Sequence, residues 1–379
     1  MNDRENRFIG FWILAVTVLG GCGGWTAGEP MAGRQALDRP PSQGHWELFW
    51  TSVDDSKPYR LTSPPLEGRS LAWSPDGTKL AFISNRDGRD EVYVMDRDGS
   101  NGLRLTYNQS DEDDPEWTPD GSRIVFTSQQ TGHWELYSMA SDGSQQRRLT
   151  RTLKGDSIDP AWSPDGQALS YVSNKDGNWE VYVMAADGSR EQRLTHNPAM
   201  DGFCWNEWSP DGRSILFDSN RDGPYQVYRM NADGSHQQNI SRTEAPAEGP
   251  AWSPDGRQVL YASRQDGNWE IYRANSDGTG ARRLTVNPAK DFNPFWSPNG
   301  NRIAFVSDRD GHNEIYVMNT DGSGQRRLTF GLADKGKDRH RWSPDGSRIA
   351  YVAYTGRDED ARRSVSAARQ REHFSASDD

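Results

Sequence analysis

Short apolar runs alternate with turn residues along most of the chain, and the segment from Asp159 to Thr195 illustrates the pattern. A first short strand ends at Trp162, and "SPDG" follows it as a turn. "QALSYVS" predicts a second strand, "NWEVYVMA" a third and "QRLT" a fourth, separated by the turns "NKDG" and "ADGS". Apolar side chains stand on both faces of the inner strands, which favours a sheet packed between two neighbouring sheets.

The tryptophan of "WSPDG" marks a long-range repeat. It recurs at steps of 44 to 46 residues, at Trp73, Trp117, Trp162, Trp208, Trp252, Trp296 and Trp342. A period of this length filled with β-type runs is typical of propeller blades. We therefore expect an all-β fold made of four-stranded antiparallel blades.

The two ends of the repeat region complement each other. The region opens with third- and fourth-strand patterns (Trp46 to Thr62) and closes with first- and second-strand patterns (Trp342 to Val352). Joined in one composite blade, they would close the ring and remove its free sheet edges. The sequence thus predicts seven blades, with six as the alternative if one unit is absorbed differently.

These units resemble the repeats of TolB-type β-propellers. The resemblance rests on Trp162 to Gly166, Asn174 to Gly177, Glu180 to Tyr182, Asp187 to Ser189 and Arg193 to Thr195, with their counterparts in other units. It extends over about residues 44–355 and implies the propeller fold. It implies less about function, because similar repeats serve periplasmic scaffolds, the propellers of serine peptidases and some sugar-active proteins. TolB itself has an α/β domain before its propeller, and the peptidases have a hydrolase domain with a Gly-x-Ser-x-Gly motif; we expect neither here.

The N-terminal segment has the character of an export signal. A polar start with Arg4 and Arg7 precedes the apolar run from Phe8 to Leu19, and Leu19 to Cys22 resembles the lipobox of bacterial lipoproteins. That resemblance implies that residues 1–21 are removed and that acylated Cys22 anchors the chain. The alternative is an ordinary export signal in which Cys22 is incidental.

Two further segments lie outside the repeat. Residues 22–43 are rich in Gly, Pro and Ala and are expected to form a flexible tether, and residues 356–379 a disordered charged tail. If Cys22 is lipidated, Cys204 has no partner for an intrachain disulfide. We expect a monomer in the bacterial cell envelope, attached to the membrane only through the lipid and facing the periplasm or the cell exterior.

The charge balance narrows the class of partner. With 44 basic and 55 acidic side chains, the formal net charge is -11. An acidic protein is poorly suited to neutralise phosphate backbones, which argues against a nucleic-acid partner.

Candidate binding residues gather where each first strand begins, on the expected face of the channel mouth. "DEDDPEW" places Asp111, Glu112, Asp113 and Asp114 there, and Asp159 and Asn293 occupy the position of Asp114 in their own units. Such groups could bind a basic peptide or a divalent cation such as Ca²⁺. The alternative is that each Asp or Asn caps its own turn before the proline.

The closing segment from Phe330 to Trp342 departs most from the repeat. It carries a basic patch that includes Lys337, Arg339 and His340 on an otherwise acidic ring. This divergence marks either a binding determinant or a weaker sequence constraint in the closing blade.

Two other sets recur in nearly every unit, and we interpret both as structural. Aromatic residues at the start of the third strand should pack between blades, although they could also stack on sugars. The Glu beside them (Glu180 and its counterparts) should form ion pairs with the cations of the preceding turns, Arg86, Lys175, Arg221 and Arg309.

Together these features predict a non-catalytic scaffold that binds a protein or peptide partner at the channel mouth, without a cofactor or a metal site. A propeller that binds or cleaves glycans is the alternative. The seven histidines are scattered, and no nucleophile constellation stands out from the repeat, which weakens the case for an enzyme.

Overall fold

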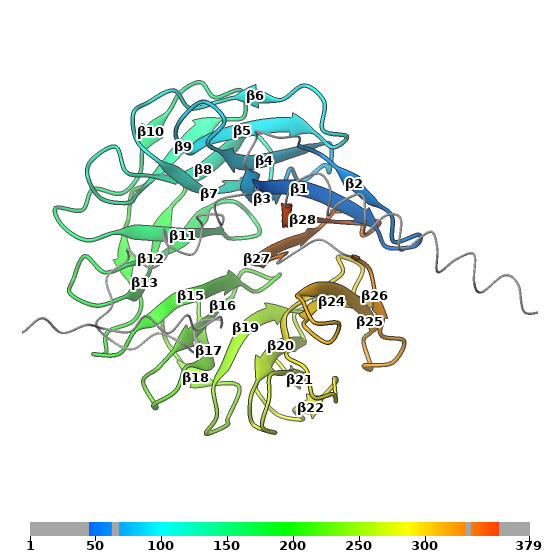
Figure 1. Cartoon of the computed structure of the whole chain (residues 1–379). Coiled ribbons are helices and arrows are strands. Elements are labelled where there is room, and N and C mark those ends of the chain that lie inside the picture. The colour runs from blue at the N-terminus through cyan, green and yellow to red at the C-terminus, as the bar shows by residue number, and fades with distance from the viewer. Residues whose placement is uncertain (1–44, 63–67, 331–334, 356–379) are drawn as a thin grey trace, which may run out of the picture.

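The computed structural model describes residues 45–62, 68–330 and 335–355 and contains seven four-stranded antiparallel sheets arranged as blades around an axis (Figure 1). The fold class and the blade count expected from the repeat are confirmed. The signal segment, Cys22, the tether and the charged tail lie outside the described residues.

Each blade begins with an innermost strand and continues outward. The first strands are β3 (Gly68–Trp73), β7 (Glu112–Trp117), β11 (Ser157–Trp162), β15 (Asp201–Trp208), β19 (Ala247–Trp252), β23 (Asp291–Trp296) and β27 (Lys335–Trp342). The second strands are β4 (Lys79–Ser84), β8 (Arg123–Ser128), β12 (Ala168–Ser173), β16 (Ser214–Ser219), β20 (Gln258–Ser263), β24 (Arg302–Ser307) and β28 (Arg348–Thr355). The third strands are β5 (Glu91–Asp96), β9 (Glu135–Ala140), β13 (Glu180–Ala185), β17 (Gln226–Asn231), β21 (Glu270–Asn275), β25 (Glu314–Asn319) and β1 (His45–Ser52). The fourth strands are β6 (Leu103–Arg104), β10 (Arg147–Arg148), β14 (Gln192–Arg193), β18 (Gln238–Asn239), β22 (Arg282–Arg283), β26 (Arg326–Arg327) and β2 (Pro58–Arg60).

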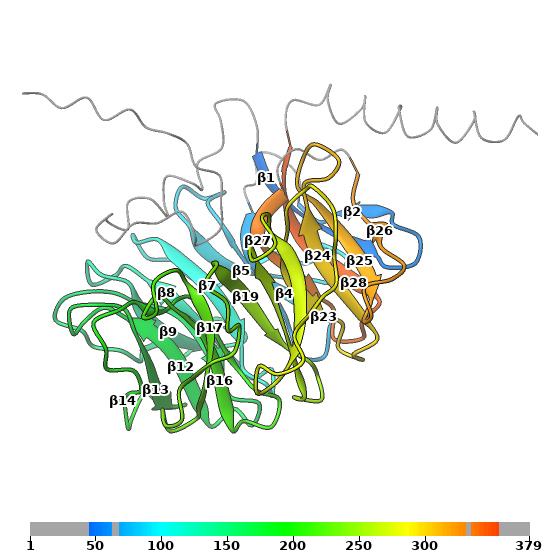
Figure 2. The same cartoon turned by 90° about the horizontal axis from the view of Figure 1, so that it is seen from below.

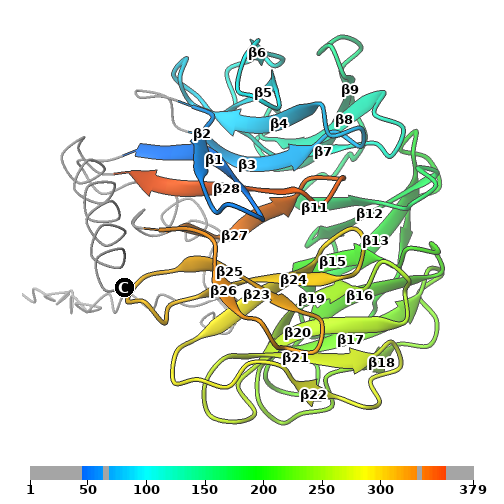
Figure 3. The same cartoon turned by 90° about the vertical axis from the view of Figure 1, so that its right-hand side faces the viewer.

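We number the blades in chain order, from blade 1 (β3–β6) to blade 6 (β23–β26), and call the last one the closing blade. Its strand order is β2-β1-β28-β27, so both parts of the chain contribute two strands. β1 pairs with β28 in antiparallel register from His45↔Thr355 to Ser52↔Arg348. The predicted composite blade is therefore confirmed (Figure 3).

The repeated "SPDG" serves both its own blade and the next one. In blade 3, Ser163 donates to Asp165 (2.6 Å), and the Ser163 hydroxyl accepts from the backbone N–H of Ala168 (2.9 Å). Gly166 takes the left-handed conformation (φ 68°) that closes the turn. Pro164 lies against Gly212, the turn glycine of blade 4, so the motif recurs because every turn supports its neighbour.

The core consists of clusters between adjacent blades. One of them joins Val125 and Leu136 of blade 2 to Leu169, Tyr171 and Tyr182 of blade 3, all buried. Both faces of the second and third strands contribute, which explains their continuous apolar runs.

Inter-blade hydrogen bonds define the face around the channel mouth. The backbone N–H of Ser157, at the start of β11, donates to the Trp134 carbonyl, which precedes β9 (2.7 Å). The same bond links Asp201 to Trp179 and Asp291 to Trp269. The starts of the first strands and the turns between second and third strands therefore share one face, here called the mouth face (Figure 2). The "SPDG" and "ADGS" turns form the far face.

No helix within the described residues is long and apolar enough to cross a bilayer.

Candidate functional site: the central channel

Four of the seven repeat tryptophans link their innermost strand to that of the preceding blade. The Trp117 indole donates to the carbonyl of Ala72 in the preceding blade (3.3 Å), and Trp208 donates likewise to Ala161 (3.1 Å). The indoles of Trp73 and Trp342 bind the carbonyls of Arg341 (3.3 Å) and Phe295 (3.4 Å). In each case the acceptor is the residue before a tryptophan. This position is thereby fixed at one level around the axis.

The residues at this level differ strongly between blades. Three of them are small (Ala72, Ala161 and Ala251), and four are large (Glu116, Glu207, Phe295 and Arg341). The four large residues are half-buried and come from blade 2, blade 4, blade 6 and the closing blade. The ring is therefore asymmetric at the level where its inner strands come closest to the axis.

The large side chains meet across the channel. The rings of Trp205 in β15 and Phe295 in β23 have centroids 5.5 Å apart, although blade 5 separates the two strands in the ring. The Arg341 guanidinium lies over the Phe295 ring at 5.2 Å from its centroid, a cation–π contact. We call Trp205, Phe295, Glu116, Glu207 and Arg341 the channel cluster.

The electrostatics of the channel cluster favour neutral carboxyl groups. Burial raises the pKa of the Glu207 carboxyl to about 7, although the Trp252 backbone N–H and the Arg341 charge favour the ionised form. Burial also raises the pKa of Glu116, and Arg341 again opposes the shift. The cluster thus combines two carboxyl groups with raised pKa values, of which that of Glu207 is about 7, with one fixed positive charge.

Two first strands, β15 and β27, are longer than the others, and both contribute side chains to the channel cluster. The register shift lies between Ile158 and Ala161 in β11, but it extends from Asp201 to Asn206 in β15 and from Lys335 to His340 in β27. The extra residues widen the β-bulge, and such bulges often re-aim side chains. The widened bulge of β15 contains Trp205, and Arg341 follows the one in β27.

The bulges also explain three of the candidate binding residues. Asp114, Asp159 and Asn293 occupy equivalent positions at φ 48°, 51° and 49°. Asp and Asn tolerate this left-handed conformation better than most residues. The Asp159 carbonyl accepts from the Asn206 amide of blade 4 (2.7 Å), and the Asn293 side chain lies beside Gly249 of blade 5.

The four acidic residues of β7 and its approach separate in the structure. Asp111 pairs with Arg89 (3.5 Å). Glu112 is fully buried in its blade and accepts from Ser128 (2.7 Å) and Asn108 (2.9 Å). Burial and the neighbouring Glu91 carboxyl raise the pKa of Glu112.

Asp113 and Asp114 stay together at the bulge. Asp113 accepts a hydrogen bond from Ser70 of blade 1 and from the Asp114 backbone N–H (2.8 Å). Their role in binding a partner stays a prediction.

The basic residues of the closing segment lie in β27. Lys337 and Arg339 fall within its widened bulge, and His340 pairs with Tyr351 of β28. Their participation in binding also stays a prediction.

The repeated glutamates are structural, but their predicted ion-pair partners were wrong. Glu180 is fully buried and pairs with Arg193 of the fourth strand (2.5 Å), and Glu270 pairs likewise with Arg283 (2.7 Å). The third and fourth strands are adjacent, so an Arg there reaches the Glu directly. The turn cations bind elsewhere: Arg221 pairs with Asp201, Arg309 with Asp291 and Lys175 with Glu191, while Arg86 stacks over Tyr93.

The aromatic residues before the third strands pack between blades. Trp179 is 8% exposed, and its ring lies 5.0 Å from that of Phe203 in blade 4. Trp134 packs against the same cluster from blade 2. The described structure therefore uses these rings as core.

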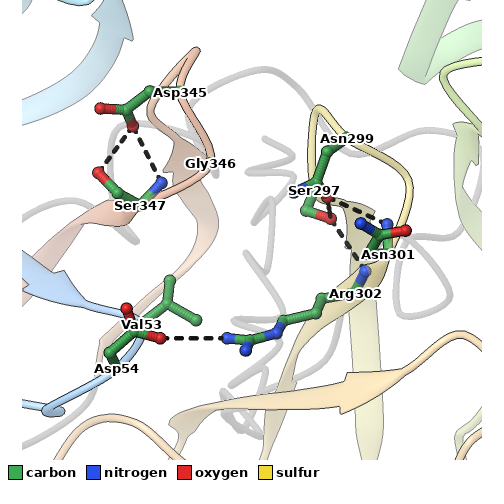
Figure 4. A pocket seen from close by; sticks show the side chains of 9 residues that line it. All are labelled: Val53, Asp54, Ser297, Asn299, Asn301, Arg302, Asp345, Gly346 and Ser347. Atoms are coloured by element: carbon green, nitrogen blue, oxygen red, sulfur yellow. Dashed lines mark hydrogen bonds and ion pairs between the residues drawn. The ribbon is translucent and has the colours of Figure 1, made fainter.

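A polar pocket of about 390 Å³ lies on the far face, at the junction of blade 6 and the closing blade (Figure 4). The turns 297–302 and 343–348 form two of its walls, and Val53 and Asp54 form the third. An ion pair joins Asp54 to Arg302 (3.7 Å). Its position marks the seam of the ring rather than the channel.

Within the ranges that the structure describes, no three His, Cys, Asp or Glu side chains come together as a metal site.

Reasoning from the sequence missed most of the channel cluster. The signal was present in the residue that precedes each tryptophan, which reads Ala, Glu, Ala, Glu, Ala, Phe and Arg around the ring. The two 46-residue steps, which end at Trp208 and Trp342, mark the two widened bulges.

Comparisons with solved structures agree on the fold. A TolB structure from Agrobacterium tumefaciens is 24% identical, with a TM-score of 0.54 over 82% of this chain and 99% of that one. An oligogalacturonate lyase in complex with manganese is 16% identical, with a TM-score of 0.65 over 84% of this chain and 100% of that one. A puromycin-hydrolyzing peptidase from Mycobacterium tuberculosis is 14% identical, with a TM-score of 0.61 over 76% of this chain and 53% of that one. These structures include a lyase and a peptidase as well as TolB, so the likeness concerns the fold.

The sequence comparison is more specific. No curated protein matches the chain. The model of the TolB β-propeller domain matches residues 51–154, 151–247 and 236–377. Its three matches cover most of the chain and include all seven blades described above. The chain belongs to the TolB β-propeller domain family.

Proposed function

We propose that the chain is a non-catalytic propeller of the bacterial cell envelope, anchored through Cys22, which holds a peptide segment of a protein partner at the channel mouth. Membership of the TolB propeller family supports a role in the envelope and a protein partner. The observation that carries the proposal is the contact of Trp205 with Phe295 across the channel. This aromatic pair forms a floor against which an extended segment would stop.

The order of residues along the first strands supports an approach from the mouth. A segment that enters there meets Asp113, Asp114 and Asp159 at the bulges. Trp205 lies in the bulge of its own strand, and Phe295 follows two positions further in. Acidic groups around an opening attract basic segments and raise their local concentration. Glu116, Glu207 and Arg341 occupy the same position in their strands as Phe295 and can bind polar groups of either sign.

Site-specific photocrosslinking in cells tests the position of the partner. A benzophenone amino acid at Trp205 preserves an aromatic ring in the channel, and the same label at Asn299 in the far-face pocket is the control. We expect a discrete crosslinked product from the first position and none from the second. The same product from both positions, or from Asn299 alone, would contradict binding at the mouth.

The acidic residues of the mouth can be tested in the same assay. Asp113→Asn combined with Asp114→Asn should lower the crosslinking yield several-fold, because it removes charge without changing shape. Asp98→Asn, in an exposed turn of the far face, is the matched control. An unchanged yield from the double variant would eliminate these carboxylates as binding determinants.

Anchoring through Cys22 is tested separately. Cys22→Ser should move the chain from the membrane fraction to the soluble fraction, and the mature wild-type N-terminus should carry acyl mass on Cys22. Several acyl chains would bind the membrane strongly, because each buried CH₂ contributes about 0.8 kcal/mol. A Cys22→Ser chain that stays with the membrane would contradict the lipid anchor.

A second candidate function is the binding or cleavage of an acidic glycan. The channel cluster favours it, because Trp205 offers a ring for stacking, Arg341 a partner for a carboxylate, and Glu207 a carboxyl group with a pKa of about 7. An oligogalacturonate lyase structure also matches over its whole length. The test is incubation with oligogalacturonate, with and without manganese, followed by absorbance of unsaturated products. Product formation that is lost in Glu207→Gln would favour this candidate over the scaffold.

A further inference from the structure

The mouth face carries most of the exposed large hydrophobic side chains. Six such residues occur among the described residues, and four of them lie in loops that lead from a fourth strand to the next blade. These are Leu153 (99% exposed), Val286 (75%), Tyr107 (70%) and Phe330 (52%). The other two, Tyr59 and Leu103, are in the outermost strands β2 and β6.

The fold explains why these side chains project from the mouth face. The Thr or Ser two residues after each fourth strand accepts a hydrogen bond from a third-strand N–H, as the Thr106 hydroxyl does from Val92 (2.9 Å). Tyr107, Val286 and Phe330 directly follow this residue, and Leu153 comes three residues after it, so all four lie beyond the end of the sheet. Two of these residues make cation–π contacts with arginines of the fourth strand. The Arg104 guanidinium lies 4.9 Å from the centroid of the Tyr107 ring, and that of Arg327 lies 4.7 Å from the centroid of the Phe330 ring.

Exposed cations lie in three of the loops that lead to the next blade. Arg151 and Lys154 flank Leu153, Lys290 follows Val286, and Arg242 occupies the equivalent place in blade 4; all four are exposed. Among the described residues of these loops, Glu244 is an exposed acidic residue, and Asp111 and Asp156 are half-buried. Apolar tips flanked by cations are the composition that favours the interface of an anionic bilayer.

Acidic side chains on the neighbouring turns are partly compensated. Asp87, Asp176, Asp266 and Asp310 each lie within 3.1–3.7 Å of an arginine of their own fourth strand. Charges further apart than about 8 Å are screened at physiological ionic strength. The local charge of the loops therefore matters more at a surface than the net charge of the chain.

The course of the chain brings this face to a membrane. β1 starts at His45, which pairs with Thr355 at the end of β28. The mouth face is where third strands begin and second strands end, so both residues belong to it. Residues 23–44, between Cys22 and β1, would span about 26 Å as a random coil. An anchor at Cys22 thus keeps the mouth face within reach of the bilayer that holds it.

We propose that the mouth face docks onto an anionic lipid surface, with Leu153, Val286, Tyr107 and Phe330 in the interface and Arg151, Lys154, Arg242 and Lys290 against the head groups. This docking rests on the anchoring proposed above and goes beyond it, because the lipid then fixes the orientation of the propeller. A partner reaches the channel along the membrane surface in this arrangement.

Depth-dependent quenching tests the docking on the intact chain. The lipid-modified protein, with Cys204→Ala, is reconstituted into vesicles of phosphatidylethanolamine and phosphatidylglycerol that contain nitroxide-labelled lipid. Leu153→Cys and Val286→Cys carry a fluorescent label on the mouth face, and Ser100→Cys and Ser189→Cys carry it on the far face. We expect at least two-fold quenching at the first pair and little at the second.

The outcomes separate docking from anchoring. Co-flotation of the protein with the vesicles, with no quenching at any site or equal quenching at all four, would overturn the docking alone. A protein that does not co-float overturns the anchor, and the docking with it.

A second variant isolates the apolar tips. Leu153→Asp with Val286→Asp changes two exposed side chains and should leave the fold intact. With the label at Tyr107→Cys, this double variant should lose at least half of the quenching, and 0.5 M salt should reduce it further by screening the cations. Unchanged quenching in the double variant would show that these tips do not hold the surface.

Discussion

Trp205 and Phe295 lie in contact across the channel, with their ring centroids 5.5 Å apart, although a complete blade separates their strands. Contacts between adjacent blades recur around the ring, but this one depends on two residues that have no counterpart elsewhere. Arg341 extends it to the closing blade through its position over Phe295. The pseudo-symmetry of the repeat is therefore broken at the centre of the molecule, where pseudo-symmetric rings can hold a single site.

The Glu207 carboxyl makes a testable contribution to pH dependence. Its pKa rises from 4.5 to about 7 on folding, so the folded state binds an extra proton in this window. Stability from this group is present below pH 4.5 and is lost as the pH rises to 7. Glu207→Gln removes this loss. The free energy of unfolding of the variant minus that of wild type should therefore increase by up to about 3 kcal/mol between pH 4 and pH 8.

Urea denaturation between pH 4 and pH 8 measures this difference. Glu244→Gln, at an exposed position, is the control and should follow the wild-type pH profile. Parallel profiles for wild type and Glu207→Gln would show that the carboxyl is not held neutral by folding.

In blade 5, removing one partner of the buried ion pair should destabilise the protein more than replacing both partners by neutral residues. Glu270 is fully buried and pairs with Arg283 (2.7 Å), and a lone buried charge is strongly destabilising. Arg283→Asn should therefore cost about 3 kcal/mol. Adding Glu270→Gln should recover most of that loss, because both partners are then neutral.

Blade 4 is a natural precedent for this double variant. Gln226 stands there in place of the glutamate and binds Ser241 (2.8 Å), and Asn239 stands in place of the arginine. A double-mutant cycle from chemical denaturation gives the coupling energy. Equal stability of the single and double variants at blade 5 would contradict the argument.

The closing blade should respond to mutation at both of its distant segments. Leu48 in β1 and Leu136 in β9 are equivalent and fully buried, so truncation of either to Ala should cost about 3 kcal/mol. Only Leu48→Ala should speed hydrogen exchange in both β1 and β28. Mass spectrometry of the corresponding peptides measures this, and unaltered exchange in β28 would mean that the two strands do not protect each other.

The tryptophan ring should depend on its hydrogen bonds unequally. Trp208 donates to the Ala161 carbonyl (3.1 Å), whereas the Trp162 indole N–H is buried without a partner among the described residues. Trp208→Phe should therefore be less stable than Trp162→Phe by about 1 kcal/mol. Thermal or urea unfolding of the two variants compares them directly, and equal losses would argue that the indole bond contributes nothing.

Most of the fold could be predicted because its determinants are local and repeated. The turn before Gly166, the hairpin at Gly188 and the fourth strand at Arg193 recur in each unit, and the order of the incomplete units predicts the closure. The ion-pair error shows a limit: Glu180 pairs with an arginine across a strand boundary, and sequence proximity favoured Lys175 in the turn.

The channel cluster could not be predicted in the same way. Glu116, Glu207 and Arg341 are far apart in the sequence and come from three different blades. Their proximity depends on ring closure and on the widened bulges of β15 and β27, which appear in the sequence only as two slightly longer steps.

The pairing of β1 with β28 also determines how the ring bears load. Tension that enters the chain at His45 and is resisted by a ligand in the channel pulls β1 lengthwise against its neighbour. All the register pairs from His45 to Ser52 then resist together, in shear. Tension between His45 and Thr355, which are paired at one end, would instead unzip them one after another. The molecule is mechanically strong in one direction of pulling and weak in the other.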